Sequence, residues 1–326
     1  MSDFATIIYI LFSTTILSAT PLIFASLGGA FSERSGVVNI ALEGIMTIGA
    51  FFAAMTSFYL APVFTSMFAG SGMTEEAVGS WVTTLAPIAG LIAAMAVGGL
   101  FAALLAYASI KFRANQVVVG VAINILAASL VTFLLRAIMG QQGQTPPVAS
   151  FQPIVGDFNA LDFLALLAIP IVWFVLYKTP GGLRIRSVGE HPRAADTLGI
   201  SVFKVRYWSV IMSGIMAGIG GASLSIALSS AFREGMVSGK GFIALAALIF
   251  GRWNPVGAGL ASLFFGLAFA LKPTIEAMKN LLGWEIPIPE EVFFMLPYLL
   301  TILAVSGLAG KKSYMPAADG IPYEKK

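Results

Sequence analysis

Long apolar stretches dominate the chain, and short polar segments separate them. Runs of about 18 or more apolar residues recur along the whole length, which is the pattern of transmembrane helices. The runs are continuous, whereas the strands of a transmembrane barrel alternate between apolar and polar positions. The predicted spans cover residues 5–30, 36–60, 85–110, 115–135, 160–177, 207–230, 241–251, 256–272 and 291–310. The sequence therefore predicts an all-α polytopic membrane protein with about eight to ten transmembrane helices.

The apolar segment 241–251 is too short to cross a bilayer core of ~30 Å as a helix. Glycines bound it on both sides, at Gly239, Gly241 and Gly251. Broken helices are tolerated at membrane depth only where protein or a water-filled cavity surrounds them. We therefore expect this segment to be a broken or re-entrant piece.

The composition indicates that lipid surrounds most of the chain. Of the 326 residues, 58% are hydrophobic and 11% are charged, whereas a soluble domain carries about 25% charged residues. The net charge of +3 gives no indication of a nucleic-acid partner, because basic residues also orient a membrane protein. We expect the lipid bilayer as a partner and no nucleic acid.

The chain lacks the residues of most reaction centres. It has no cysteine, and His191 is its one histidine, which excludes disulfides, thiolate metal sites and multi-histidine metal sites. The sequence contains no phosphate-binding loop of the form G-x-x-x-x-G-K-[ST] and no Ser/His/Asp or Cys/His set. We expect a protein that is not an enzyme, with no catalytic residues, no metal and no cofactor.

Lysine and arginine predict the orientation in the membrane. With the polar segment 178–206 in the cytoplasm, 14 of the 19 basic residues fall on the inside and five on the outside, as the positive-inside rule requires. The loops 61–84 and 137–159 then face outward. This arrangement places the N-terminus outside and the tail 311–326 inside; if residues 32–38 are re-entrant, the N-terminus lies inside instead. The tail is polar and contains proline, a composition typical of poorly ordered termini.

Glu43 is the strongest candidate for a buried functional charge. It follows Asn39 at i, i+4 spacing, so that a helix would place both side chains on one face, and a long uncharged stretch follows it. An ionisable side chain below the lipid headgroups is costly and usually faces a cavity or a partner. Two interpretations of segment 33–46 stay open: the polar lining of a translocation path, or a pairing that fixes a helix break, within the helix or with Arg34.

A second polar stripe lies in segment 115–124. Asn124 stands inside an otherwise apolar helix, where its amide needs hydrogen-bond partners. A solute and a neighbouring helix are both suitable partners. Asn115 lies at the start of the same helix, so it either lines the path or only caps the helix.

The segment 180–200 is polar and basic, between two apolar spans. His191–Pro192 is a typical helix start, residues 193–198 continue the helix, and Gly199 is a typical helix end. A short helix of this kind in a membrane protein indicates a docking site for another protein.

Four segments together resemble the permease subunits of bacterial ABC importers, in the branched-chain amino acid, ribose and nucleoside group. These segments are 33–46, 115–124, 188–200 and 241–255. Within that group the likeness is greatest to nucleoside and simple-sugar permeases associated with basic membrane lipoproteins. The resemblance implies a multi-pass permease of the bacterial plasma membrane, with a transmembrane domain over 1–310, a cytoplasmic coupling loop over 178–206 and a polar tail over 311–326.

The resemblance also implies roles and partners. An ABC ATPase subunit would supply energy, a second homologous permease would complete a heterodimeric channel, and an extracellular lipoprotein would deliver the solute. The residues that would couple to the ATPase are Gly189, Glu190, His191, Pro192, Arg193, Ala194, Ala195, Asp196 and Gly199. The residues that would line the solute path are Asn39, Glu43, Asn115 and Asn124.

We interpret the chain as the path-forming subunit of an ATP-driven importer, with a nucleoside as the solute. A path with few charges suits a neutral polar solute. Simple sugars and branched-chain amino acids are the alternatives within the resemblance. An ion-coupled secondary carrier that uses Glu43, and a membrane-embedded enzyme or scaffold, are the alternatives of other classes.

Overall fold

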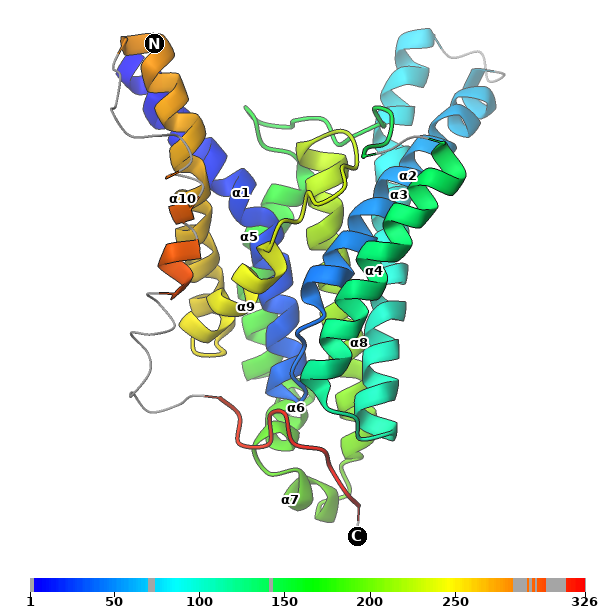
Figure 1. Cartoon of the computed structure of the whole chain (residues 1–326), viewed down its shortest axis with the longest axis vertical. Helices are drawn as coiled ribbons and strands as arrows, with labels where there is room; N and C mark the ends of the chain where they lie inside the picture. The colour runs from blue at the N-terminus through cyan, green and yellow to red at the C-terminus, as the bar shows by residue number, and fades with distance from the viewer. Residues whose placement is uncertain are drawn as a thin grey trace.

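In a computed structural model, the chain folds into a bundle of long helices that run between two ends of the molecule (Figure 1). The structure describes residues 3–69, 74–140, 143–283, 292, 295–296, 298–302 and 315–325. The long helices are α1 (Asp3–Arg34), α2 (Leu42–Ala69), α3 (Glu75–Ala106), α4 (Gln116–Met139), α5 (Ala160–Lys178), α8 (Val202–Ala222) and α10 (Pro255–Leu282). The shorter elements are α6 (Pro180–Glu190), α7 (Pro192–Thr197), α9 (Lys240–Phe250) and two π-helical turns, η1 (Tyr107–Lys111) and η2 (Ser223–Leu228).

The expected all-α membrane fold is confirmed. The described part of the chain contains seven helices long and apolar enough to cross a membrane. Within the same ranges, β-structure is limited to two isolated bridges, between Gln144 and Arg233 and between Val155 and Phe158. The predicted short segment 241–251 forms α9, with 11 residues. The predicted span 291–310 lies mostly outside the described residues.

Close backbone contacts between glycines hold the centre of the bundle together. A Cβ atom on Gly98 of α3 would lie 2.4 Å from the carbonyl oxygen of Gly214 on α8, and the reverse distance is also 2.4 Å. Small residues let membrane helices approach closely enough for extensive van der Waals contact. The helices α2, α3 and α8 thus form a tightly packed group beside α1, α9 and α10 (Figure 1).

Two non-helical segments separate helices of the bundle. Residues 35–41 link α1 to α2, and residues 229–239 link η2 to α9. Their backbone amides and carbonyls lack the partners that a helix supplies, so other groups must bond them at membrane depth. The side chains that do so define the candidate site.

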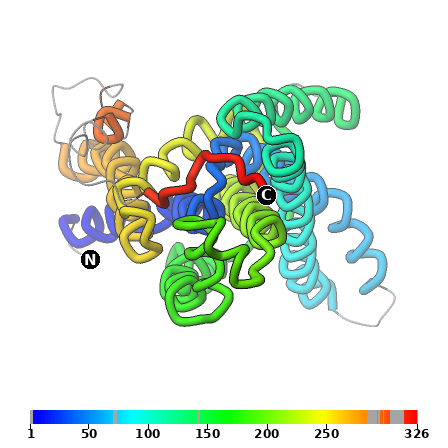
Figure 2. The backbone as a smooth tube through the Cα atoms, turned by 90° about the horizontal axis from the view of Figure 1, so that it is seen from below, coloured from blue at the N-terminus to red at the C-terminus, as the bar shows by residue number. Residues whose placement is uncertain are grey.

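The end of the bundle that carries α6 and α7 differs from the expectation of a single short helix. The segment forms two helices, because Thr179 caps a first one that starts at Pro180: its hydroxyl accepts a hydrogen bond from the amide of Gly182 at 3.2 Å. Residues 315–325, expected to be poorly ordered, pack against this end, and Figure 2 shows them (red) crossing it from below. The two chain ends lie at opposite ends of the bundle (Figure 1).

Candidate solute path and cytoplasmic docking face

Glu43 closes the start of the broken helix α9. Its Oε1 accepts a hydrogen bond from the amide of Gly239 at 2.7 Å, and its Oε2 accepts one from the amide of Gly241 at 2.7 Å. These amides have no partner within the helix, and the positive end of the helix dipole favours an anion there. A Cβ atom on Gly241 would lie 2.5 Å from the backbone nitrogen of Glu43, so the contact requires glycine. The carboxylate therefore joins α2 to α9.

Asn124 of α4 performs a similar task on the other side of the break. Its Oδ1 accepts a hydrogen bond from the amide of Gly44 at 2.7 Å, and its Nδ2 donates to the carbonyl of Ile40 at 3.0 Å. One amide side chain thus bonds the backbone on both sides of the start of α2. The polar group inside an apolar helix thus has protein partners at both its oxygen and its nitrogen.

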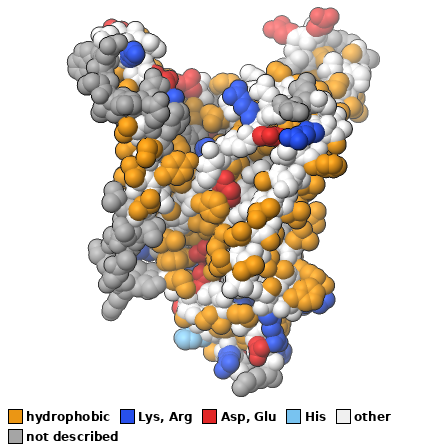
Figure 3. Space-filling model, in the orientation of Figure 1, with side chains coloured by type: hydrophobic (Ala, Val, Ile, Leu, Met, Phe, Trp, Pro, Cys, Tyr) orange, Lys and Arg blue, Asp and Glu red, His pale blue; other side chains and the backbone are white. Residues whose placement is uncertain are grey.

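Glu43 and Asn124 also line one cavity of about 340 Å³ between α2, α4 and the loop before α9. This volume is at the small end of the range of ~300–1,000 Å³ for small-molecule sites. Figure 3 shows acidic side chains along the middle of this face, flanked by hydrophobic surface. The remaining lining is Gly44, Thr47, Ala128, Val131, Thr132, Phe232, Glu234, Gly235, Val237 and Ser238.

The lining combines hydroxyl groups, one aromatic ring and one exposed carboxylate. Thr47 and Thr132 offer hydroxyls, and Phe232 is held in place by a T-shaped contact with Phe51, with ring centroids 5.4 Å apart. Glu234 is the exposed acid, whereas both oxygens of the other acid in the lining are bonded to backbone amides. Such a cavity suits a neutral, hydroxyl-bearing solute with an apolar face.

The other two predicted path residues lie outside this lining. Asn39 is fully buried: its Nδ2 donates to the Ser213 hydroxyl at 2.8 Å, and its Oδ1 accepts from the amide of Ala41 at 3.1 Å. Asn115 caps α4, where its Oδ1 accepts from the amides of Val117 and Val118. Both side chains therefore bond protein partners in this structure.

Several residues of the cavity were not predicted from the sequence. Thr47 stands one helical turn after Glu43, so the i, i+4 rule could have found it. Phe232, Glu234 and Ser238 belong to a loop whose approach to α2 and α4 depends on the whole fold. The glycine break at the start of α9 was the sequence signal for this loop, since helices that glycine interrupts often form the binding site of a transporter.

The predicted coupling segment lies at one end of the bundle, in α6, α7 and the turn that follows. Gly189 is buried against α1, where a Cβ atom would lie 2.2 Å from the carbonyl oxygen of Arg34. Ala195 is buried in a small apolar cluster with Val188, Val202 and Tyr323. Gly199, with φ of +81°, adopts the left-handed conformation that ends the helical segment.

Most of the other residues of the segment are exposed, so another protein can reach them. His191, Arg193, Ala194 and Gly199 are exposed, and Glu190 keeps 47% of its side chain exposed. Leu198, which the sequence analysis did not single out, is 80% exposed. Figure 3 shows basic side chains gathered at this lower end, near the histidine. Charges around an apolar centre are typical of a protein-docking surface.

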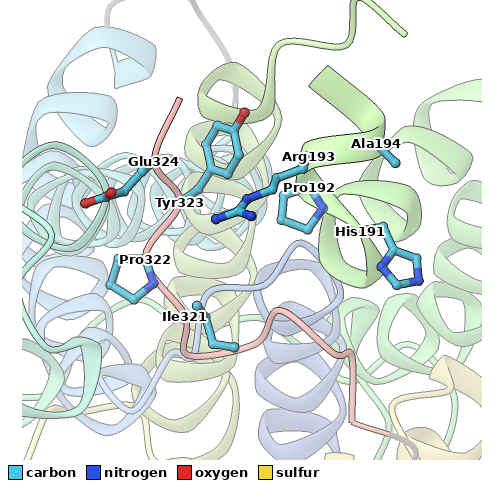
Figure 4. A pocket seen from close by; sticks show the side chains of 8 residues that line it. All are labelled: His191, Pro192, Arg193, Ala194, Ile321, Pro322, Tyr323 and Glu324. Carbon is cyan, nitrogen blue, oxygen red and sulfur yellow. The ribbon is translucent and has the colours of Figure 1, made fainter. Parts of the chain in front are cut away.

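The C-terminal residues 315–325 cover one side of this segment. The amide of Ala318 donates to the carbonyl of Gly189 at 2.8 Å, and Lys325 pairs with Asp196 at 3.6 Å. Between α7 and the C-terminal residues lies a cavity of about 550 Å³. In Figure 4, Arg193 reaches toward Tyr323, whereas His191 and Ala194 point away from it.

Arg206 of α8 is buried beneath residues 315–325 and bonds their backbone. It is 2% exposed, and its guanidinium donates to the carbonyls of Ser35, Ile321 and Ala318 at 3.2, 3.0 and 3.4 Å. The neighbouring Asp319 is buried, and burial raises its pKa to about 9, with repulsion from Glu33 adding to the shift and attraction to Arg206 opposing it. The link from α1 to α2, the start of α8 and the C-terminal residues therefore form one unit.

Comparison with known proteins gives the family. Residues 11–305 match the family described as "Branched-chain amino acid transport system / permease component". The chain belongs to this family. The permease is 43% identical to the guanosine ABC transporter permease protein NupQ of Bacillus subtilis, over 99% of both chains. It is 39% identical to the nucleoside ABC transporter permease protein NupC of Lactococcus lactis subsp. cremoris, over 97% of both.

A second Bacillus subtilis relative is the guanosine ABC transporter permease protein NupP, which is 27% identical over 90% of this chain and 81% of its own length. No solved structure matches the chain. Family membership and the seven apolar helices identify a multi-pass protein of the bacterial plasma membrane, as expected from the sequence. The permease is thus a transport subunit by family.

Proposed function

We propose that this permease forms half of the channel of an ATP-driven nucleoside importer. The observation that carries the proposal is the 43% identity to a guanosine permease over 99% of both chains. The cavity at Glu43 and Asn124 supports it, because hydroxyls, an aromatic ring and an exposed acid suit the sugar and the base of a nucleoside. Asn39 and Asn115 shape the path indirectly, by fixing the turn before α2 and the start of α4.

The partners follow from the same proposal. A cytoplasmic ATPase docks on α7 and pushes it, and a second, homologous permease completes the channel. The organism that holds NupQ also holds NupP, which supports a channel of two different permeases. An extracellular lipoprotein delivers the nucleoside to the outer end.

The bonding of Glu43 supports the importer over the ion-coupled carrier. A coupling carboxylate must exchange an ion or a proton during transport. Both oxygens of Glu43 already accept hydrogen bonds from the amides of Gly239 and Gly241, so its charge stabilises the start of α9. Energy then comes from a separate ATPase.

Uptake by the complete importer tests the solute. Cells that lack their own nucleoside importers receive the permease with its ATPase, second permease and lipoprotein, and the uptake of radiolabelled guanosine is measured. We expect uptake that excess unlabelled nucleoside competes away and that glucose and leucine leave unchanged. Competition by glucose or leucine alone would assign the path to those solutes. Ion-driven accumulation by the lone permease in vesicles would identify a secondary carrier.

Co-purification tests the docking face. Ala194 is exposed on α7 and its side chain points away from Tyr323, so tryptophan at this position blocks a closely fitting partner. Overpacking costs about 1–3 kcal/mol, which corresponds to about 5- to 150-fold weaker binding of the ATPase. The matched control is Ala137→Trp, on an exposed alanine near the opposite end of the bundle. Equal recovery of the ATPase with both variants would contradict the assignment of α7.

A further inference from the structure

A further cavity, at the cytoplasmic end of the bundle, shares no lining residue with the cavity at Glu43 and Asn124. It has a volume of about 400 Å³ and lies where α1, α6 and α8 meet. Its lining changes from charged to apolar: Arg184 and Lys204 are exposed at its mouth, and Phe31 and Met212 are apolar parts of its wall. A pocket with basic side chains at its mouth and apolar side chains in its wall matches a molecule with an anionic head and an apolar body.

One side chain in this cavity has an unused hydrogen-bonding group. Ser209 is 2% exposed and lines the cavity, and its hydroxyl has no hydrogen-bond partner in the described part of the chain. Buried polar groups almost always have a partner, and an exception calls for one that is absent from the protein itself. The hydroxyl can donate to an oxygen of a molecule in the cavity.

The two basic side chains are also available. Neither Arg184 nor Lys204 forms an ion pair with any residue that the structure describes. They come from different elements, α6 and the first turn of α8, so the fold brings together two charges that are 20 positions apart. Arginine and lysine are the usual side chains for binding a phosphate group.

The position of the cavity relative to the membrane indicates which anionic molecule can reach it. Trp208, 71% exposed, lies one helical turn beyond Lys204 on α8, which is about 6 Å along the axis. Tryptophan is enriched at the level of the lipid headgroups, and basic pockets on the cytoplasmic side of membrane proteins meet the anionic lipids of that leaflet. The cavity therefore opens at the depth where phospholipid phosphates lie.

We propose that this cavity binds the phosphate head group of an anionic phospholipid from the cytoplasmic leaflet. Arg184 and Lys204 hold the phosphate, the hydroxyl of Ser209 donates to a head-group or ester oxygen, and the acyl chains pass over Trp208 and Met212 into the bilayer. The inference rests on the membrane location of the protein and on the proposed cytoplasmic position of this end, and it does not depend on the solute.

The experiment measures thermal unfolding of the full-length permease in a neutral detergent, with increasing phosphatidylglycerol. Phosphatidylcholine and glycerol 1-phosphate are titrated in parallel. We expect phosphatidylglycerol to raise the unfolding temperature in a saturable manner, and the other two to have little effect. Equal stabilisation by glycerol 1-phosphate would show a site for a free phosphate compound and would overturn the lipid assignment.

Variants assign the effect to the cavity. Each basic residue near an anionic surface contributes about fivefold to binding, so Arg184→Gln with Lys204→Gln should weaken phosphatidylglycerol binding about 25-fold. The matched control removes two exposed bases at the same end of the bundle but outside the cavity lining, Lys111→Gln with Lys178→Gln, and should change binding little. Equal weakening by both double variants would show general attraction to anionic lipid and overturn the site.

Ser209→Ala separates binding from folding. Removing a buried hydroxyl that has no partner leaves stability unchanged or raises it in the absence of lipid. The same change should reduce the stabilisation that phosphatidylglycerol provides. Loss of stability without lipid would show that the hydroxyl already has a partner within the protein. If the double variant at Arg184 and Lys204 loses its second permease or its ATPase in co-purification, the cavity belongs to that protein interface instead.

Discussion

Replacing Glu43 by glutamine tests whether this carboxylate acts as the end cap of α9. In the native protein the two oxygens accept two charge-assisted hydrogen bonds, each 2.7 Å long, from the amides of Gly239 and Gly241. Glutamine keeps one acceptor oxygen and turns an NH₂ group toward the second amide. It therefore loses one bond and the favourable interaction of a charge with the helix end.

The expected loss follows from these contacts. A hydrogen bond to a charged group contributes about 1.5–3 kcal/mol, and the interaction of the charge with the helix end adds about 0.3–1 kcal/mol. We expect Glu43→Gln to destabilise the protein by about 2–4 kcal/mol. At about 2–4 °C per kcal/mol for a chain of this size, the unfolding temperature falls by about 4–16 °C. Transport per folded molecule falls much less, because the cavity keeps its shape.

Glu234→Gln is the matched control, because it makes the same chemical change in the same cavity at an exposed side chain. Its unfolding temperature should equal that of the native protein, and its transport should change. Unfolding in detergent and nucleoside uptake in cells are measured for both variants. An unchanged unfolding temperature for Glu43→Gln, combined with abolished uptake, would refute the capping role and identify the carboxylate as a binding group for solute or ion.

Three further predictions concern the rest of the site and the cytoplasmic end. Asn124→Leu removes two hydrogen bonds to the backbone around α2, so stability falls by about 2–4 kcal/mol and uptake falls with it; uptake lost at full thermal stability would indicate direct contact with solute. Arg206→Lys cannot serve three carbonyls with a planar fork, so residues 315–325 become several-fold more sensitive to protease; native-like resistance would contradict their role as a packed segment. Asp319 has a raised pKa of about 9, so its protonated form fits the folded state, and its contribution to stability falls as pH rises from about 4 toward 9. Asp319→Asn should therefore unfold at a higher temperature than the native protein at pH 8–9, with a smaller difference at pH 6, and parallel pH profiles would contradict the assignment.

The helices and the broken segment were predictable because long apolar runs along the chain mark where they lie. A long apolar run needs only local information, and the 11 residues of α9 stand out because glycines bound them. Glu43 and Asn124 were found by the same reasoning, since a polar group in an apolar helix must have a partner. Their partners could not be predicted, because both residues bond backbone groups, and a backbone amide has no signature in the sequence.

The end of the bundle that carries α6 and α7 was harder to predict for a different reason. The packing of residues 315–325 depends on hydrogen bonds to Gly189 and Arg206, more than 100 positions earlier in the chain. Composition alone indicates a poorly ordered tail, because the tail has few apolar side chains. Composition carries no information about the contacts that the tail makes in the folded protein. Likewise, α6 begins at a cap from Thr179. This helix was not predicted, because the segment is polar and lacks the apolar pattern of a membrane helix.

The hydrogen bonds of Arg206 have a consequence for biosynthesis. The ribosome makes Arg206 more than 100 residues before Ala318 and Ile321, which supply two of the three carbonyls that bond it. Until those residues emerge, the guanidinium has only Ser35 among these three partners. A chain that ends early would keep an incompletely bonded cation at its inner face, where chaperones and proteases that survey newly inserted proteins could recognise it.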